Sequence, residues 1–194
     1  MGWISDVDFL CWKVENVDTR TFVAPSIDAR ESVKDTMDQL TIARALHVLA
    51  VVIWIGGVGF VTTVLLPAVR LLKTPAERVG FFDAVERRFA WQARATTLLA
   101  AATGFFMTSQ LDLWSRFFSA AYWWMHAMVA VWLLFTIMLF VTEPLVLHGW
   151  FHQRAKSDPE GTFVLIERMH RILLVVSLIT ILGAVAGSHG GLQR

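Results

Sequence analysis

Histidine is the residue type in this chain best suited to bind a cofactor, and three of its six histidines fall at one depth of the apolar segments defined below. His47 and His126 each lie about one helical turn inside a segment, and His189 closes the last segment. Neutral imidazole binds haem iron, copper or zinc. The pattern predicts a cofactor site at this level, with His47 and His126 as metal ligands and His189 as a substitute for either.

The remaining histidines gather at the opposite ends of the segments. His148 and His152 adjoin a polar stretch, so we interpret them as solvated, whereas His170 stays a further candidate for binding the cofactor. His126 and His148 are 22 residues apart, or about 33 Å along a helix at about 1.5 Å per residue. Two haems stacked along this helix would not both fit in the membrane core, so we expect a single site.

Two methionines beside His126 offer a second chemistry. The run Met125-His126-Ala127-Met128 places thioethers, which favour Cu(I), next to an imidazole. Met125 and Met128 can share a helix face, but His126 is rotated away from Met125. Methionine also fills apolar interfaces. We therefore favour packing for these methionines and keep copper as the alternative cofactor.

An acidic residue ends the longest uncharged stretch. Glu143 follows 26 uncharged residues and precedes Pro144, which removes a backbone hydrogen bond and can kink a helix. An acid at this depth either pairs with Arg94, at the start of another apolar segment, or handles protons. We favour the ion pair slightly.

Four uncharged stretches must position these side chains: residues 45–69, 95–111, 117–142 and 172–193. A helix needs about 20 apolar residues to cross a bilayer, and isolated strands would leave backbone groups unpaired in lipid. The sequence therefore predicts an all-α integral membrane four-helix bundle over residues 41–194. Its predicted spans are about 45–69, 95–114, 119–145 and 170–189.

The flanking residues predict an orientation. Lysine and arginine concentrate in the predicted loops 70–94 and 148–171, whereas the short segment 112–122 has only Arg116. Since basic loops stay in the cytoplasm, both termini are expected outside a cell (inner) membrane. Tryptophans at both sets of helix ends fit an interfacial belt: Trp91 and Trp150 at one, and Trp114, Trp123 and Trp124 at the other.

Residues 1–40 form a polar amino-terminal extension. They contain eight acids and four bases, and they lack the basic start and apolar core of a signal peptide. Two interpretations have similar weight: a small outer cap lying on the surface through Trp3, Phe9 and Trp12, or a stretch preceding a natural start at Met37.

Composition limits the partners. A net charge of +1 argues against a nucleic-acid partner, which needs a basic face, and one cysteine builds neither a disulfide framework nor a thiolate site. Gly183 and Gly187 form a small-xxx-small face, typical of close helix packing or of a dimer. The expected partners are the lipid bilayer and either a second copy of the chain or a larger membrane complex.

Three short motifs resemble known membrane families. The run LHVLAVVIWIGG at 46–57 resembles the first helix shared by the HemJ type of protoporphyrinogen oxidase and the CopD type of copper-resistance protein. VERRF at 85–89 and WMH at 124–126 resemble the inner loop and the third helix of the HemJ type. The likeness covers roughly residues 40–145.

The resemblance implies a small multi-helix protein that binds b-type haem, with His47 the ligand carried over. HemJ-type proteins oxidise protoporphyrinogen late in haem synthesis, but they have a lysine where this chain has Met128. The leading hypothesis is a membrane haem b protein that serves electron transfer or a haem-linked oxidoreductase step near the outer face, with a quinone or other redox partner. The alternatives are a CopD-like copper-handling protein and a non-catalytic accessory subunit of a membrane complex.

Overall fold

A computed structural model describes residues 27–188 of the chain, without the side chains of 27–30, 144–148 and 151–152. His189 lies outside the described residues, and so do the side chains of His148 and His152. The chain divides into two units, 1–41 and 42–194. The sites described below all belong to the second unit.

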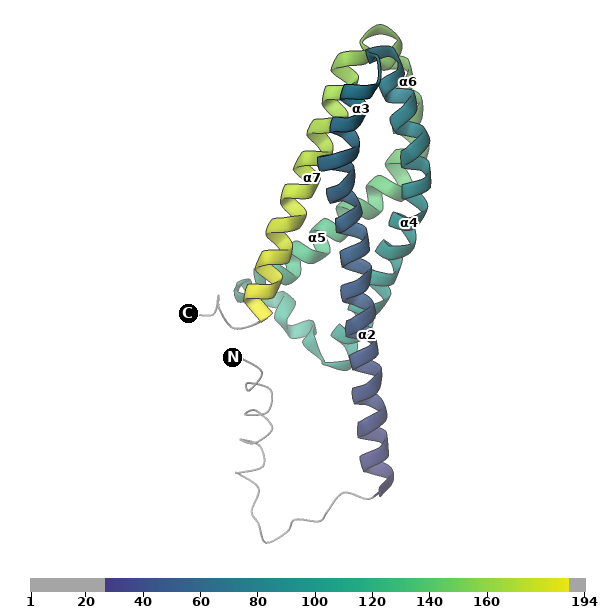
Figure 1. Cartoon of the computed structure of the whole chain (residues 1–194). Helices are drawn as coiled ribbons and strands as arrows, with labels where there is room; N and C mark the ends of the chain where they lie inside the picture. The colour runs from purple at the N-terminus through teal and green to yellow at the C-terminus, as the bar shows by residue number, and fades with distance from the viewer. Residues whose placement is uncertain (1–26, 189–194) are drawn as a thin grey trace. The chain divides into compact units, whose positions relative to one another are not determined.

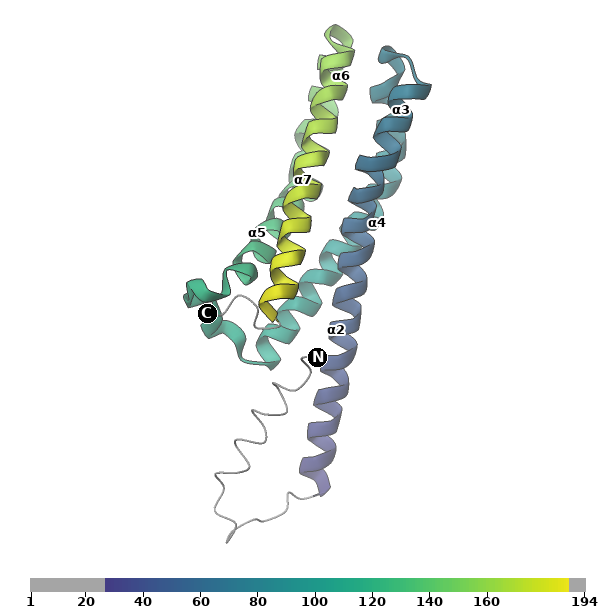
Figure 2. The same ribbon diagram turned by 60° about the vertical axis from the view of Figure 1, so that its left-hand side comes forward.

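The described residues form long helices joined by short turns (Figures 1 and 2). The elements are α2 (Ile27–Phe60), the π-helix η2 (Val61–Leu65), α3 (Leu66–Leu72), α4 (Pro75–Gln110), the 3-10 helices η3 (Leu113–Phe118) and η4 (Ala120–Tyr122), α5 (Trp123–Ile137), the π-helix η5 (Met138–Leu147), α6 (His148–Ser157) and α7 (Pro159–Ser188). The prediction of an all-helical protein is confirmed for this range.

Three of these helical stretches are long and apolar enough to cross a membrane: Glu31–Leu72, Ala120–Glu143 and Pro159–Ser188. The apolar half of α4 is not among them, because it is diluted by threonine, glycine, serine and glutamine. Large apolar side chains remain exposed along the candidate spans, among them Val52, Leu133, Ile137, Ile179 and Leu182. Contiguous exposed apolar surface of this kind is typical of a face in contact with lipid.

The prediction that 70–94 and 148–171 are loops was wrong. Helix α4 begins at Pro75 and α7 at Pro159, so the only breaks lie at Lys73–Thr74 and at Asp158. Charge marks where a helix leaves an apolar environment, but glutamate, arginine and alanine are good helix formers and continue it. At its other end α4 stops at Gln110, short of the predicted boundary at 114, and Asp112 turns the chain with a φ of 49°.

Helix α4 has a well-formed start. The Thr74 side chain accepts a bond from the Glu77 backbone N–H, and the Glu77 carboxylate accepts bonds from Thr74 N at 3.1 Å and from Thr74 Oγ1 at 2.7 Å. Pro75 occupies the first turn, where its missing N–H costs nothing. This capping box fixes the point at which the chain reverses.

The two reversals, at Lys73–Thr74 and Asp158, lie at the same end of the second unit, which we call the turn end (Figure 1). Phe163 of α7 is fully buried there, with the guanidinium carbons of Arg70 and Arg78 at 5.9 and 5.8 Å from its ring centre. Both arginines also pair with Glu160. These contacts tie α3 and α4 to the start of α7.

At the opposite end, α7 packs on the start of α5. A Cβ at Gly183 would collide with the ring of Trp123, and one at Gly187 with the ring of Trp124. The small-xxx-small face therefore serves packing within the chain. Trp124 is buried by this contact, whereas Trp91, Trp114, Trp123 and Trp150 are exposed.

The helix that contains Pro144 changes its pitch. Residues 138–147 form the π-helix η5, continuous with α5 and α6, and proline without an N–H favours such a departure from α-helical bonding. Arg94 Nε of α4 donates to the carbonyl of Leu139 at 3.1 Å. The widened turn thus has one of its carbonyls satisfied from a neighbouring helix.

Candidate functional site

His47 of α2 is held by two groups of α4. Its Nδ1 lies 2.9 Å from the Ala100 carbonyl oxygen and 3.0 Å from Thr103 Oγ1. A carbonyl can only accept, so the neutral ring carries its hydrogen on Nδ1 and leaves a lone pair on Nε2. Thr103 Oγ1 donates to the Leu99 carbonyl at 2.7 Å and is therefore free to accept from the same Nδ1. The tautomer of His47 is fixed by this arrangement.

The ring of His47 also lies against α4. A Cβ at Gly104 would be 3.3 Å from His47 Cε1, closer than most side chains permit. Gly104 thus allows the half-buried imidazole to fit between the two helices. Its position and its tautomer are both set by the apolar part of α4.

His126 is presented differently. Its Nε2 lies 2.9 Å from the Phe117 carbonyl and its Nδ1 lies 3.3 Å from the Tyr122 carbonyl. The side chain is exposed and meets the Phe117 ring edge to face at 5.7 Å. Both ring nitrogens therefore face hydrogen-bond acceptors, and binding a metal would require His126 to leave at least one of them.

Among the described residues, the other predicted ligands do not join His47 either. His170 lies in a separate pocket near the turn end, described below. Of the copper candidates, Met125 is buried while His126 and Met128 are exposed. In the described part of the chain, no group of three or more histidine, cysteine, aspartate or glutamate residues could hold a metal ion.

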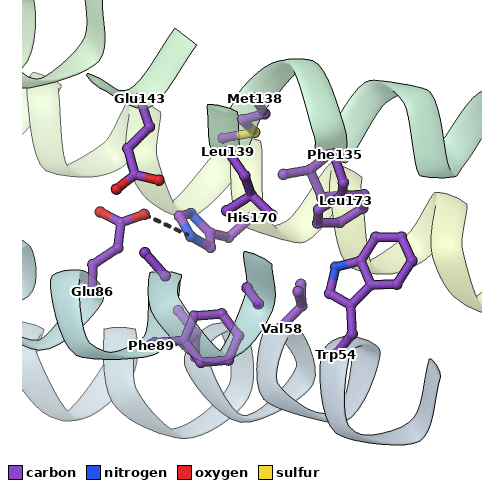
Figure 3. A pocket seen from close by; sticks show the side chains of 13 residues that line it. Trp54, Val58, Glu86, Phe89, Phe135, Met138, Leu139, Glu143, His170 and Leu173 are labelled. Carbon is purple, nitrogen blue, oxygen red and sulfur yellow. Dashed lines mark ion pairs between the residues drawn. The ribbon is translucent and has the colours of Figure 1, made fainter. Parts of the chain in front are cut away.

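Between α2, α4, α5, η5 and α7 lies a pocket of about 50 Å³, which Figure 3 shows from close by. Its polar lining consists of Glu86, Glu143, His170 and the indole nitrogen of Trp54; apolar side chains such as Phe89 and Phe135 form the rest. The two carboxylates point toward each other (Figure 3). This volume admits a few water molecules but no macrocycle.

Glu143 forms the ion pair with Arg94 that the sequence suggested. Its Oε2 lies 3.3 Å from Arg94 Nη2, and the two side chains are 15% and 25% exposed. Arg94 is held in place by its second bond, to the Leu139 carbonyl. Glu143 is therefore the carboxylate of the pocket that has a cation beside it.

Glu86 faces a different environment. It lies in the charged first half of α4, outside the three candidate spans. Burial, reinforced by the negative charges of Glu143 and Asp83, raises the pKa of Glu86 to about 7. His170 Nε2 lies 4.0 Å from its Oε1. The carboxyl group is thus poised to gain or lose a proton near neutral pH.

Sequence reasoning did not identify Glu86 as a site residue, although a signal was present. Glu86, Phe89, Ala90 and Ala93 follow helical spacing, and all four line the pocket. An acid on an otherwise apolar helix face is unusual. Because Arg87 and Arg88 follow Glu86 directly, the sequence suggested that all three side chains were exposed to solvent.

Comparison of the chain with protein-family models, with curated proteins and with solved structures gives no match.

Proposed function

We propose that this chain is a multi-pass protein of the cell inner membrane that binds b-type haem through Nε2 of His47. In this proposal four helices cross the bilayer, with α4 as the fourth beside the three candidate spans, and both termini lie outside. The turn end faces the cytoplasm, since Arg70, Lys73 and Arg78 lie at or beside its first reversal. The protein serves electron transfer or a haem-linked oxidoreductase step.

The observation that carries the proposal is the hydrogen bonding of His47. Metal-ligating histidines almost always donate their other ring N–H to a carbonyl or carboxylate, which fixes the tautomer and raises ligand basicity. His47 Nδ1 makes such a hydrogen bond to the Ala100 carbonyl, and a second one to Thr103 Oγ1. The resemblance of residues 46–57 to the first helix of HemJ-type and CopD-type proteins also supports His47 as the ligand.

The chain offers one oriented imidazole as a ligand for the iron, and not two. His47 offers a lone pair, whereas His126 has both nitrogens at carbonyl oxygens. A haem iron bound in this way supplies one-electron chemistry, and the chain supplies a single imidazole in a fixed orientation. We therefore propose that His47 would hold the haem iron and that His126 would not.

The test compares two variants of the protein purified in mild detergent from haem-supplemented cells. His47→Ala is expected to abolish the Soret band, while His126→Ala retains it, because only His47 is oriented as a ligand. Full haem content in His47→Ala would refute the assignment. Bound copper without a Soret band would favour the copper-handling alternative, and a colourless, metal-free protein that co-purifies with partners would favour the accessory subunit.

A further inference from the structure

The pocket near the turn end contains a buried donor with no partner. The Trp54 side chain is 4% exposed, and its Nε1 has no hydrogen-bond partner within the described part of the chain. The indole nitrogen is turned toward the pocket (Figure 3). Buried polar groups are almost always satisfied by protein or by ordered water. Trp54 therefore points to a ligand in the pocket that accepts a hydrogen bond.

The opposite wall offers acceptors at a spacing suited to water. His170 Nδ1 lies 2.9 Å from the Ile166 carbonyl, so it carries the hydrogen, and Nε2 is an acceptor. That Nε2 is 4.0 Å from Glu86 Oε1, too far for a direct hydrogen bond and suited to a bridging water molecule. Water molecules need two to four polar partners each, and Trp54, His170 and Glu86 supply polar groups along the lining of the same pocket.

The charges around Glu86 do not balance. Glu143 faces it from η5 and Asp83 lies on its own helix, while His170 faces it from α7. Arg94, a cation beside the pocket, pairs with Glu143. The wall from α2 contributes only Trp54 and apolar side chains. A partly shielded carboxylate that faces other negative charges favours its protonated form.

The pocket is not sealed from outside. The side chain of Glu86 is 33% exposed although its carboxyl group lines the pocket. It lies in the charged first half of α4, and a proton can reach it from this exposed side. These features distinguish Glu86 from Glu143, which is fixed in its ion pair.

We infer that this pocket is a water-filled proton-exchange site in which Glu86 is the group that binds the proton and Trp54 and His170 hold the water beside it. In the exchange, a proton passes from hydronium in the pocket to a carboxylate oxygen of Glu86, which becomes a carboxylic acid and leaves a neutral water. Glu143 stays paired with Arg94. The site is separate from His47 and needs no haem.

Infrared difference spectroscopy tests this inference on the full-length protein in lipid nanodiscs. Wild-type protein is expected to show the C=O stretching band of a protonated carboxylic acid near neutral pH. The band should disappear as the pH rises and shift when H2O is replaced by D2O. Absence of the band, or a band that does not shift in D2O, would overturn the inference without recourse to any variant.

Variants then assign the band. Glu86→Gln should remove it completely, whereas Glu167→Gln should retain it, because Glu167 is a similarly shielded acid of α7 that pairs with Arg70 at 3.0 Å. Trp54→Phe keeps the aromatic shape but removes the donor, so the band should remain and change frequency. A band that survives Glu86→Gln, or is unaffected by Trp54→Phe, would contradict the assignment. The Soret band plays no part in this readout, so its outcome is independent of the haem proposal.

Discussion

Arg94→Gln removes the cation beside Glu143 while leaving the carboxylate in the pocket. Two contacts are lost: the ion pair at 3.3 Å and the bond from Nε to the Leu139 carbonyl at 3.1 Å. Glu143, which is 15% exposed beside Arg94, then loses that cation. The cost therefore comes mainly from the loss of this ion pair at a shielded carboxylate.

The magnitude follows from the degree of burial. Breaking a fully buried ion pair costs about 4 kcal/mol, and breaking an exposed pair costs about 0.5 kcal/mol. With Arg94 25% and Glu143 15% exposed, the solvent-screened value is about 2 kcal/mol. At about 1.4 kcal/mol per tenfold change, this corresponds to a roughly 30-fold shift in the unfolding equilibrium.

The assay is unfolding of the detergent-solubilised protein, completed by a double-mutant cycle. Glu143→Gln in the Arg94→Gln background should recover most of the lost stability, because it removes the shielded negative charge that Arg94 had faced. Arg87→Gln on the same helix is the matched control: Arg87 is 63% exposed, and its partner Asp83 is 3.8 Å away, so its loss should change stability by less than about 0.5 kcal/mol. Equal effects of Arg94→Gln and Arg87→Gln, or no recovery in the double variant, would refute the reasoning.

Two further predictions concern packing and capping. A Cβ at Gly57 would overlap the Phe89 ring, whereas one at Gly56 meets nothing within 4 Å; Gly57→Ala should therefore cost about 1–3 kcal/mol in unfolding experiments, and Gly56→Ala should be neutral or stabilising. Unchanged stability of Gly57→Ala would show that α2 and α4 do not approach closely there. Hydrogen bonds from Thr74 lower the pKa of Glu77 below 4.5, so its carboxylate stabilises the folded state above that pH and loses this contribution as the pH falls through the lowered pKa. The melting-temperature difference between wild type and Glu77→Gln should accordingly shrink below pH 4.5, and a difference that grows on acidification would contradict the capping role.

Much of the helical fold is predictable from the sequence because apolar length and helix propensity are local properties. The uncharged stretches around His47, His126 and Leu173 lie on helices in the structure. The breaks were misplaced because a change from apolar to charged residues reports a change of surroundings, and α4 and α7 continue through it. The Thr74–Glu77 capping box would have placed the start of α4 correctly.

The site was harder to predict, since it depends on how helices face one another. Depth alone made His47 and His126 equivalent, but only His47 has a carbonyl of a neighbouring helix at Nδ1 and a free Nε2. The rotation of each helix about its axis and the path of residues 113–122 determine which atoms face the ring nitrogens of each histidine. Neither can be predicted from the spacing of residues along the sequence. The Arg94–Glu143 pair was predictable because both residues end apolar stretches on one side. Glu86 was missed because its partners come from three other helices.

The most direct test of the account is the absorption spectrum of the purified wild-type protein, recorded oxidised and after reduction with dithionite. Haem bound through His47 predicts a Soret band that shifts on reduction, in proportion to protein and at one haem per chain. A protein that stays colourless after expression with added haem would contradict the account at its centre and leave His47 as a structural residue between α2 and α4.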